Sequence, residues 1–349
     1  MAENVIFYGP PGTGKTHWLQ SLLNDYIDYS ISDQQIIDAY TRYSQDWLLI
    51  TLVILQSRQK MRATEIQAKV TSLGLKRKVN VSSELEYHNV APSALGAARQ
   101  QPRVFYEYTS GQWYVDRVRL LQHDPYFFEH YLKTSTVDRR YAFVTFHQSF
   151  SYEDFIEGIR PSYDEKTKSV DYSPKAGVFK LMCEEAASFP EKNYAVFIDE
   201  INRGNISEIF GELISLIEID KREGCANELS TVLPYSKETF VVPANLNIYG
   251  TMNSADKSIA AIDIALRRRF KFLPVLPQAN VIKSELELVG IDATNIDGVN
   301  LLELFSVINA RIELLLDANH LIGHSFFLNV RTAEDIGNII KERIVPLLE

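Results

Sequence analysis

The sequence has few cysteines and no long apolar run. Its two cysteines, Cys183 and Cys225, stand far apart in 349 residues, which argues against a disulfide framework or a cysteine metal site and fits a reducing compartment. The most apolar run, Trp47–Leu55, is too short to span a bilayer and indicates a buried helix instead. No secretory or transit segment opens the chain, so we expect a cytoplasmic protein with no membrane contact.

An overall excess of positive charge is also missing. The formal net charge is −9, which argues against non-specific binding of polyanions by the whole surface but leaves local patches open. Apolar residues make up 46% of the chain and charged residues 23%, as in ordinary soluble globular proteins. The length allows one large domain or two to three smaller ones.

The strongest motif is VIFYGPPGTGKT, Val5–Thr16. A short apolar run enters the spacing G-x-x-x-x-G-K-T of a phosphate-binding loop, whose glycines let backbone N–H groups point at a polyphosphate. Lys15 adds a cation at the outer phosphates, the Thr16 hydroxyl is a magnesium ligand, and His17–Leu23 is a predicted helix that faces the same anion. The alternative, a glycine- and proline-rich surface turn, is disfavoured by the order of strand, loop and helix. The predicted nucleotide-binding residues here are Gly9, Pro10, Pro11, Gly12, Thr13, Gly14, Lys15, Thr16 and His17.

A segment with its own pattern, residues 33–138, interrupts the nucleotide-binding machinery. The predicted helices are Trp47–Gln56, Ala63–Leu73 and one that begins in Pro92–Arg99, and the predicted hairpin joins Arg103–Tyr108 to Gln112–Val115. Three helices followed by a hairpin resemble a winged helix-turn-helix, so we predict an α+β insert of this kind.

Positive charge concentrates in this insert. Between residues 58 and 103, nine Lys or Arg stand against three Glu, so the rest of the chain carries about −15. Such asymmetry is typical of a module that contacts nucleic acid, and we predict DNA contacts from Lys76, Arg77, Lys78 and Arg99. The alternative is a solvated basic face on a spacer or on a domain that contacts other subunits.

Two apolar strands after the insert end in polar side chains. Tyr194–Glu200, YAVFIDE, is typical of a buried parallel strand and brings Asp199 and Glu200 to the edge where open α/β sheets bind ligands. Asp199 is expected to hold Mg²⁺ through water, and Glu200 to polarise the water that attacks the γ-phosphate. Leu246–Asn253 places Asn253 where it touches that phosphate and that water. Acidic strand ends are common, but the upstream phosphate loop favours this interpretation.

Three consecutive arginines, Arg267–Arg269, close the helical pattern Ile262–Phe270. Their planar guanidinium groups suit phosphate oxygens. The alternative is compensation of the helix dipole at its C-terminus, and we expect at least one of the three to be structural in that way.

Four segments resemble the McrB family of AAA+ proteins, which are nucleotide-driven motor subunits of modification-dependent restriction systems. They are Phe146–Pro161, Phe197–Glu218, Gly250–Phe270 and His320–Phe327. MNSADKS within the third is similar to the M-N-x-x-D signature that accompanies a preference for GTP, although Lys257 stands where the family more often has Arg. The resemblance covers residues 5–24 and 141 to the end, and the basic insert lies outside it.

The resemblance implies a role for each matching residue. Gly9–Thr16 is Walker A, Asp199 and Glu200 are Walker B, and Asn253 is sensor 1. Asp256 is the signature carboxylate, near which guanine preference is decided. Arg268 and Arg269 are the leading candidates for arginine fingers that reach a neighbouring subunit's nucleotide, and Arg203 is expected to face the subunit interface.

The resemblance also implies an α/β fold. We expect a parallel αβα core in residues 1–32 and 139–276, followed by a helical lid in 277–349, where Ile308–Leu316 and Ile336–Leu348 have helical periodicity. Because an arginine finger acts only in trans, the implied assembly is a ring, expected to be a hexamer. Mg²⁺ and GTP, or alternatively ATP, would lie at each subunit boundary.

The implied partners are a McrC-like endonuclease subunit and DNA, either modified or unmodified. No PD-(D/E)xK-like pattern lies on a plausible strand pair, so the cutting partner must be another protein. Few residues precede the phosphate loop, and the chain stops at Glu349 inside an apolar helix pattern. We therefore expect that a separate recognition domain is missing and that the lid is truncated.

Three functions stay open on the sequence alone. The first is a GTP-hydrolysing restriction motor that acts in anti-phage defence with a nuclease partner. The second is an ATP-hydrolysing AAA+ defence or remodelling protein, against which the signature argues. The third is a nucleotide-dependent DNA-binding scaffold, which intact Lys15, Asp199, Glu200 and Asn253 disfavour.

Overall fold

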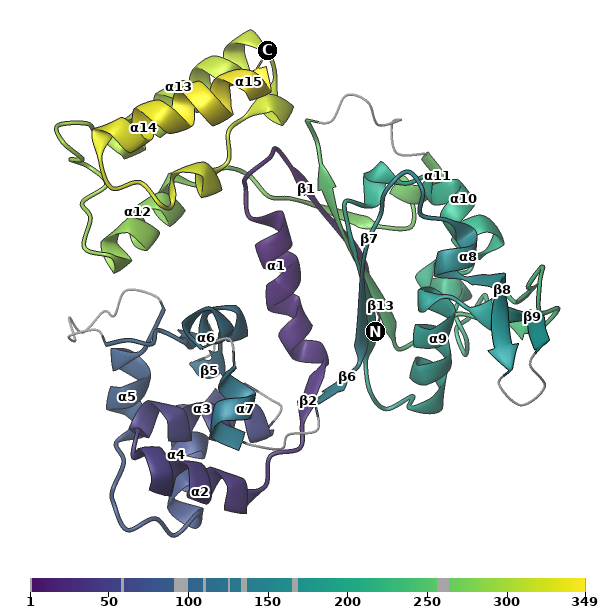
Figure 1. Cartoon of the computed structure of the whole chain (residues 1–349), viewed down its shortest axis with the longest axis horizontal. Helices are drawn as coiled ribbons and strands as arrows, with labels where there is room; N and C mark the ends of the chain where they lie inside the picture. The colour runs from purple at the N-terminus through teal and green to yellow at the C-terminus, as the bar shows by residue number, and fades with distance from the viewer. Residues whose placement is uncertain are drawn as a thin grey trace. The chain divides into compact units, whose positions relative to one another are not determined.

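The computed structural model describes residues 2–57, 60–90, 100–108, 111–124, 126–132, 137–164, 169–255 and 264–348. The chain divides into two compact units, one of residues 1–19 and 140–349, which we call the core unit, and one of Gln20–Arg139, which we call the inserted unit (Figure 1). The sequence placed the insert at 33–138. The compact inserted unit begins earlier, within the last turns of the helix that follows the phosphate loop.

A five-stranded parallel sheet forms the centre of the core unit. Its strands stand in the order β14, β1, β13, β10, β7. Their bounds are Asn4–Gly9 (β1), Tyr141–Thr145 (β7), Tyr194–Asp199 (β10), Leu246–Asn253 (β13) and Lys271–Pro274 (β14). Gly9 lies in register with Asn253, and Asp199 with Thr145, so the carboxyl ends of these strands meet at one edge.

Helices cover both faces of this sheet. In Figure 1 the sheet stands between α1 and a group formed by α8, α9 and α10. Their bounds are Lys15–Leu22 (α1), Tyr152–Phe155 (α8), Val178–Ser188 (α9) and Ile206–Phe210 (α10). The core against the second group includes four fully buried phenylalanines, Phe146, Phe155, Phe179 and Phe210. The predicted αβα core is therefore confirmed. Both faces of the central strands are covered, which is why these strands read as apolar runs.

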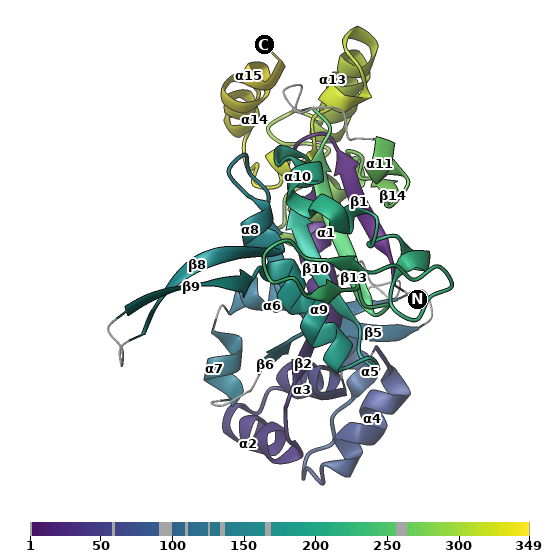
Figure 2. The ribbon, with the colours of Figure 1, turned by 90° about the vertical axis from the view of Figure 1, so that its right-hand side faces the viewer.

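A long hairpin separates α8 from α9. Its strands, β8 (Glu157–Asp164) and β9 (Ser169–Ala176), pair antiparallel and extend away from the sheet (Figure 2). Glu157 anchors the base of the hairpin, since its buried carboxylate accepts hydrogen bonds from Lys180 Nζ at 3.1 Å and from two backbone N–H groups of the 235–236 turn, each at 2.9 Å. Burial alone would raise the pKa of Glu157, but these donors lower it.

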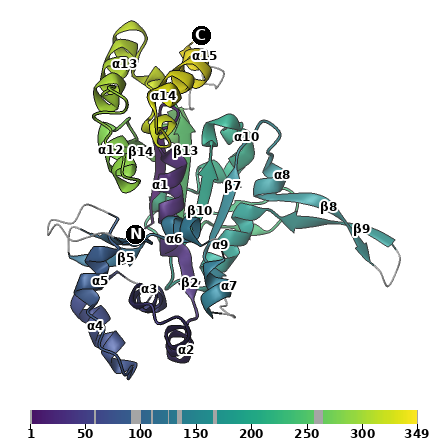
Figure 3. The same ribbon diagram turned by 60° about the vertical axis from the view of Figure 1, so that its left-hand side comes forward.

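A separate apolar core holds the C-terminal helices together. These helices are Ala279–Leu288 (α12), Leu301–Leu315 (α13), Ala333–Ile339 (α14) and Val345–Leu348 (α15), with a π-helical turn at Ile340–Ile344 (Figure 3). Ile282, Leu286 and Leu301 are fully buried among them. The predicted helical lid is confirmed.

The inserted unit has the element order of a winged helix. Its helices are Asp33–Tyr43 (α2), Asp46–Ser57 (α3), Ala63–Ser72 (α4), Val81–Tyr87 (α5), Arg117–His123 (α6) and Phe127–Leu132 (α7). An antiparallel sheet in the order β3, β5, β4 joins Met61–Arg62, Gln112–Val115 and Phe105–Glu107. The strands β2 (Ile27–Tyr29) and β6 (Val137–Arg139) pair where the chain enters and leaves. Two of the predicted helices are present as α3 and α4, and the predicted hairpin is present as β4 and β5, whereas β3 and α5 were not predicted.

The third helix that the sequence predicted begins in Pro92–Arg99, and because residues 91–99 are outside the described part of the chain, it stays a prediction. The described third helix is α5, which starts after Asn80, whose side chain accepts a hydrogen bond from Ser83 N–H at 3.3 Å, and which buries Val81 and Leu85. The Asn cap followed by this apolar pair is a helix signal that the sequence already carried.

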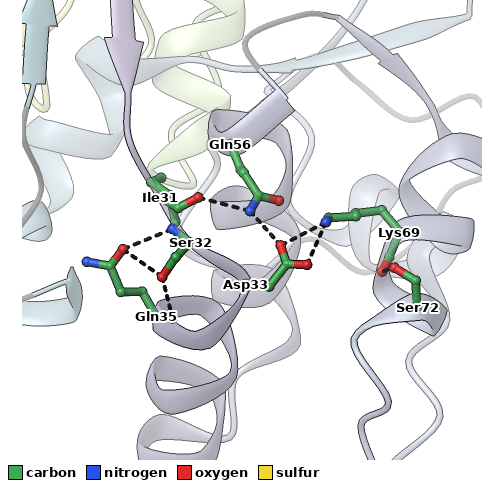
Figure 4. Close-up of polar contacts among 7 residues, drawn as sticks. All are labelled: Ile31, Ser32, Asp33, Gln35, Gln56, Lys69 and Ser72. Carbon is green, nitrogen blue, oxygen red and sulfur yellow. Dashed lines mark hydrogen bonds and ion pairs between the residues drawn. The ribbon is translucent and has the colours of Figure 1, made fainter.

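Polar contacts tie α2 to α3 and α4 (Figure 4). Ser32 and Gln35 form a capping box at the start of α2. Asp33 accepts hydrogen bonds from Lys69 Nζ at 2.8 Å and from Gln56 Nε2 at 2.6 Å, and these two donors lower its pKa. The first turn of α2 is thus the point where the three helices meet.

The apolar run Trp47–Leu55 is buried along its whole length in α3, as the sequence predicted. Among the described residues, no helix combines the length and apolarity needed to cross a membrane.

Candidate nucleotide-binding site

The phosphate loop leaves β1 at Gly9 and enters α1 at Lys15. Gly12 and Gly14 adopt left-handed backbone conformations, with φ of 75° and 79°, which explains why glycine stands at both positions. The Lys15 ammonium donates to the carbonyl oxygens of Gly9 and Pro10, at 2.9 and 2.7 Å. The loop therefore curls around its own lysine, as the motif predicts for a polyphosphate cradle.

Three elements converge beside this loop. The Thr16 hydroxyl, at the start of α1, donates to Asp199 Oδ1 at the end of β10, over 3.4 Å. Thr251 on β13 also donates its hydroxyl to Asp199 Oδ1 and accepts the Glu200 N–H at 3.0 Å. Thr251 is a site residue that the sequence analysis missed. The sequence pointed to Thr251 only indirectly. Ile198 of β10 pairs with Gly250 of β13, so the next residues of the two strands, Asp199 and Thr251, lie side by side.

The oxygen atoms at this edge suit a magnesium ion. Thr16 and Asp199 supply a hydroxyl and a carboxylate, and Mg²⁺ prefers oxygen ligands, usually one or two carboxylates completed by phosphates and water. No group of three or more His, Cys, Asp or Glu that could hold a metal occurs in the described residues. Thr16 and Asp199 would fit a magnesium ion whose other ligands are phosphate and water oxygens.

Glu200 follows Asp199 in a left-handed backbone conformation, with φ 53° and ψ 46°. Glutamate rarely adopts this conformation, and such strain clusters at functional sites. The Glu200 side chain is 28% exposed, and its carboxylate pairs with Arg203 Nε at 3.2 Å. A carboxylate that is partly exposed and held at the sheet edge is suited to accept a proton from water.

Asn253 ends β13, the strand between β1 and β10. The side-chain oxygen of Asn253 accepts a hydrogen bond from the Ala255 N–H at 3.3 Å. Its backbone carbonyl oxygen accepts one from Asn202 Nδ2 at 3.2 Å. The register with Gly9 places Asn253 between the phosphate loop and Asp199, which is where a group that orients water is needed.

The three arginines differ in their surroundings. Arg267 and Arg268 are exposed, whereas the Arg269 side chain is only 5% exposed and pairs with Glu218 at 2.9 Å. The guanidinium of Arg269 is thus paired inside its own chain, which favours Arg268 over Arg269 as the candidate finger. The structural role that we expected for one arginine was compensation of the helix dipole, whereas Arg269 pairs with a carboxylate.

Two predicted positions in the signature, Asp256 and Lys257, belong to residues 256–263, which lie outside the described part of the chain. The expected guanine contact of Asp256 stays a prediction.

A lid segment lies on the phosphate loop. Gly323 N–H donates to Pro11 O at 3.0 Å, and Ser325 N–H donates to Gly12 O at 2.9 Å. His324 between them is buried, and its Nδ1 accepts the Gln278 N–H at 3.3 Å. Burial lowers the pKa of His324, and His17 lowers it further, whereas Glu285 raises it. The sequence analysis assigned no role to this segment beyond its family resemblance.

The predicted DNA-contacting residues fall on a turn. Lys76, Arg77 and Lys78 are exposed between α4 and α5, and Arg77 NH2 lies 3.4 Å from Asp46 Oδ2. Arg99 lies outside the described residues. The third helix itself, α5, carries Glu84 and Glu86 but no Lys or Arg. Among the described residues between 60 and 103, six Lys or Arg precede the third helix and Arg103 follows it.

Comparisons with known proteins agree with this geometry. Residues 300–349 match the family "McrB, alpha-helical lid domain", and residues 127–270 match "AAA domain (dynein-related subfamily)". The second range includes β7, β10 and β13 but not the phosphate loop, which the inserted unit separates from them.

Two relatives come from restriction systems. The chain is 39% identical to the type IV methyl-directed restriction enzyme EcoKMcrB subunit of Escherichia coli K12. The matched 223 residues cover 60% of this chain and 47% of the relative. The chain is 25% identical to the type II restriction enzyme BsuMI component YdiS of Bacillus subtilis 168. The matched 166 residues cover 39% of this chain and 48% of the relative. The chain thus matches about half the length of each relative.

Proposed function

Because this chain belongs to the McrB family of AAA+ proteins, we propose that it is a GTP-hydrolysing motor subunit of a modification-dependent restriction system directed against phage DNA. The observation that carries the proposal is the meeting of Lys15, Thr16, Asp199, Glu200 and Asn253 at one edge of the sheet. A scaffold that only bound nucleotide would have no need for a strained glutamate beside that edge.

Each group at this edge has a definite part in hydrolysis. The loop N–H groups and Lys15 bind the triphosphate, and Thr16 and Asp199 would hold Mg²⁺. When bound, Mg²⁺ offsets the negative charge of the phosphates. Glu200 accepts a proton from water as the water oxygen attacks the γ-phosphorus and the bond to the bridging oxygen breaks, while Asn253 orients that water.

We further propose a cytoplasmic ring, expected to be a hexamer, in which Arg268 reaches the nucleotide of the neighbouring subunit. The exposure of Arg268 supports this role. The E. coli relative is a subunit of a methyl-directed restriction enzyme, and by analogy we propose a McrC-like endonuclease subunit as the partner that cuts DNA.

Phosphate release with GTP and with ATP, measured side by side, tests the proposed function. We expect turnover with GTP to exceed turnover with ATP, and a candidate endonuclease partner to stimulate it. A preference for ATP would favour an ATP-driven AAA+ defence or remodelling protein. DNA binding that depends on nucleotide, without turnover of either nucleotide, would favour a scaffold.

We propose that the inserted unit contacts DNA through phosphates. Lys76, Arg77 and Lys78 are exposed in a turn, and the acidic α5 is poorly suited to approach the major groove. Replacing all three by Glu should weaken DNA binding and make its salt dependence shallower, by up to about three units of log Kobs against log [salt]. Binding to one DNA duplex over a salt series measures both effects.

A charge-matched variant controls for the change in net charge. Lys283, Lys341 and Arg343 are exposed on the lid, and their replacement by Glu should leave DNA affinity nearly unchanged. Equal losses in both triple variants would show a general charge effect. An unchanged affinity in the insert variant would show that the insert does not read DNA.

A further inference from the structure

The lid segment Gly323–Ser325 packs directly against the phosphate loop. A Cβ atom on Gly323 would lie 1.9 Å from the Gly12 carbonyl carbon, so only glycine fits there. Two backbone hydrogen bonds, from Gly323 to Pro11 O and from Ser325 to Gly12 O, flank the side chain of His324. The position of the His324 backbone is therefore determined by the loop that binds phosphates.

The hydrogen bonding of His324 determines where its ring carries a proton. Nδ1 accepts the backbone N–H of Gln278, so the proton of the neutral imidazole resides on Nε2. Burial favours this neutral form. Nε2 faces the phosphate loop, since a Cβ on Gly14 would lie 3.5 Å from it. Nε2 makes no hydrogen bond within the described part of the chain, and so presents a single N–H donor beside Gly14.

We propose that His324 is the lid's own contact with the nucleotide: its Nε2–H donates to an oxygen of the α- or β-phosphate at the Gly14 side of the loop. The proposal rests on the proposed nucleotide site. Gly14 precedes Lys15, and in a phosphate loop the backbone here cradles the α- and β-phosphates while the lysine reaches the outer ones. Because these two phosphates are present in both GTP and GDP, His324 contributes equally to the binding of substrate and product.

Nucleotide affinity in three variants of the full chain tests the proposal. His324→Leu removes the donor and should weaken binding of both GDP and GTP by about 10- to 100-fold, the range for a hydrogen bond to a charged group. His324→Gln keeps an N–H donor at similar reach and should restore most of the affinity. His320→Leu, in the lid turn that precedes this segment and paired with Asp317, is the matched control and should bind like the parent protein.

Two outcomes separate this inference from the proposed function. If Lys15→Ala abolishes binding while His324→Leu binds both nucleotides like the parent protein, the phosphate loop is the site and the role of His324 is wrong. If Lys15→Ala binds nucleotide normally, the proposed site itself fails. A loss that His324→Gln does not restore would show that the ring only packs there, which also contradicts the proposal.

A spectroscopic measurement on the parent protein covers the case in which His324→Leu does not fold. In protein labelled with ¹⁵N-histidine, His324→Gln identifies the ring signals of His324 by their loss. We expect the signals of a neutral Nε2–H tautomer, with a shift of the Nε2 resonance when GDP is added. An Nε2 resonance that stays unchanged at saturating GDP would overturn the proposal.

Discussion

Glu200→Gln should remove GTP hydrolysis and keep nucleotide binding. Glutamine has the shape of glutamate but cannot accept a proton from water, so we expect the rate of phosphate release to fall by about 10²- to 10⁴-fold. The phosphate loop and Lys15 are untouched, and the hydrogen bond from the Glu200 N–H to Thr251 involves only the backbone. Affinity for GTP should therefore stay within about twofold, because the substitution removes no contact to phosphate. Steady-state phosphate release and equilibrium binding measure the two effects separately.

A nearby glutamate provides the control for this prediction. Glu208 is exposed on α10, and its backbone N–H donates to the side chain of the cap residue Asn205. Glu208→Gln should hydrolyse GTP like the parent protein. Full turnover by Glu200→Gln would mean that another group activates the water and that the strained backbone at Glu200 serves a different purpose.

Arg268→Ala should lower turnover, whereas Arg269→Ala should lower the stability of the folded chain. Arg268 is exposed, so its loss should leave the folded chain stable but lower turnover by about 10³-fold or more, as removal of an arginine finger does. Arg269 is buried against Glu218, so its loss should lower the free energy of unfolding by about 1–3 kcal/mol. The cost stays moderate because Lys221 also pairs with Glu218, at 2.7 Å. Thermal melting and phosphate release, measured on both variants, distinguish the two roles.

Mixing two inactive variants tests whether Arg268 acts across a subunit boundary. A subunit with Arg268→Ala keeps its own Glu200, and a neighbour with Glu200→Gln keeps Arg268. A boundary between the two therefore contains both groups, and we expect the mixture to regain part of the turnover. A mixture as inactive as its components would contradict a finger that acts in trans.

The core fold was predictable because its signals are local. Each central strand reads as an apolar run followed at once by the residue that acts at its end, namely Gly9, Asp199 or Asn253. In a parallel sheet the carboxyl ends of neighbouring strands share an edge, so the order of strands and motifs was enough to bring these residues together. The winged-helix order followed in the same way from helix and strand periods. The helix α5 was not predicted, because the cap at Asn80 was overlooked.

Other parts of the site depend on contacts between distant residues. Thr251 contacts Asp199 because of the register between β10 and β13, which the sequence of neither strand reveals. Arg268 and Arg269 are chemically identical neighbours, and contacts with distant residues, such as that of Arg269 with Glu218, distinguish them. The tautomer of His324 depends on the backbone N–H of Gln278, and its place depends on the packing of the lid on the phosphate loop.

The sequence by itself thus determined the chemistry of this protein: a phosphate loop, a carboxylate pair and a polar strand end on a parallel sheet, with a basic insert and a helical lid. Motif spacing and apolar periodicity are properties of short segments, so they can be read without coordinates. The tertiary structure alone decided which of several equivalent side chains are buried and which are exposed. Orientation and burial arise from pairings such as Arg269 with Glu218, and such pairings join residues that are far apart in the chain.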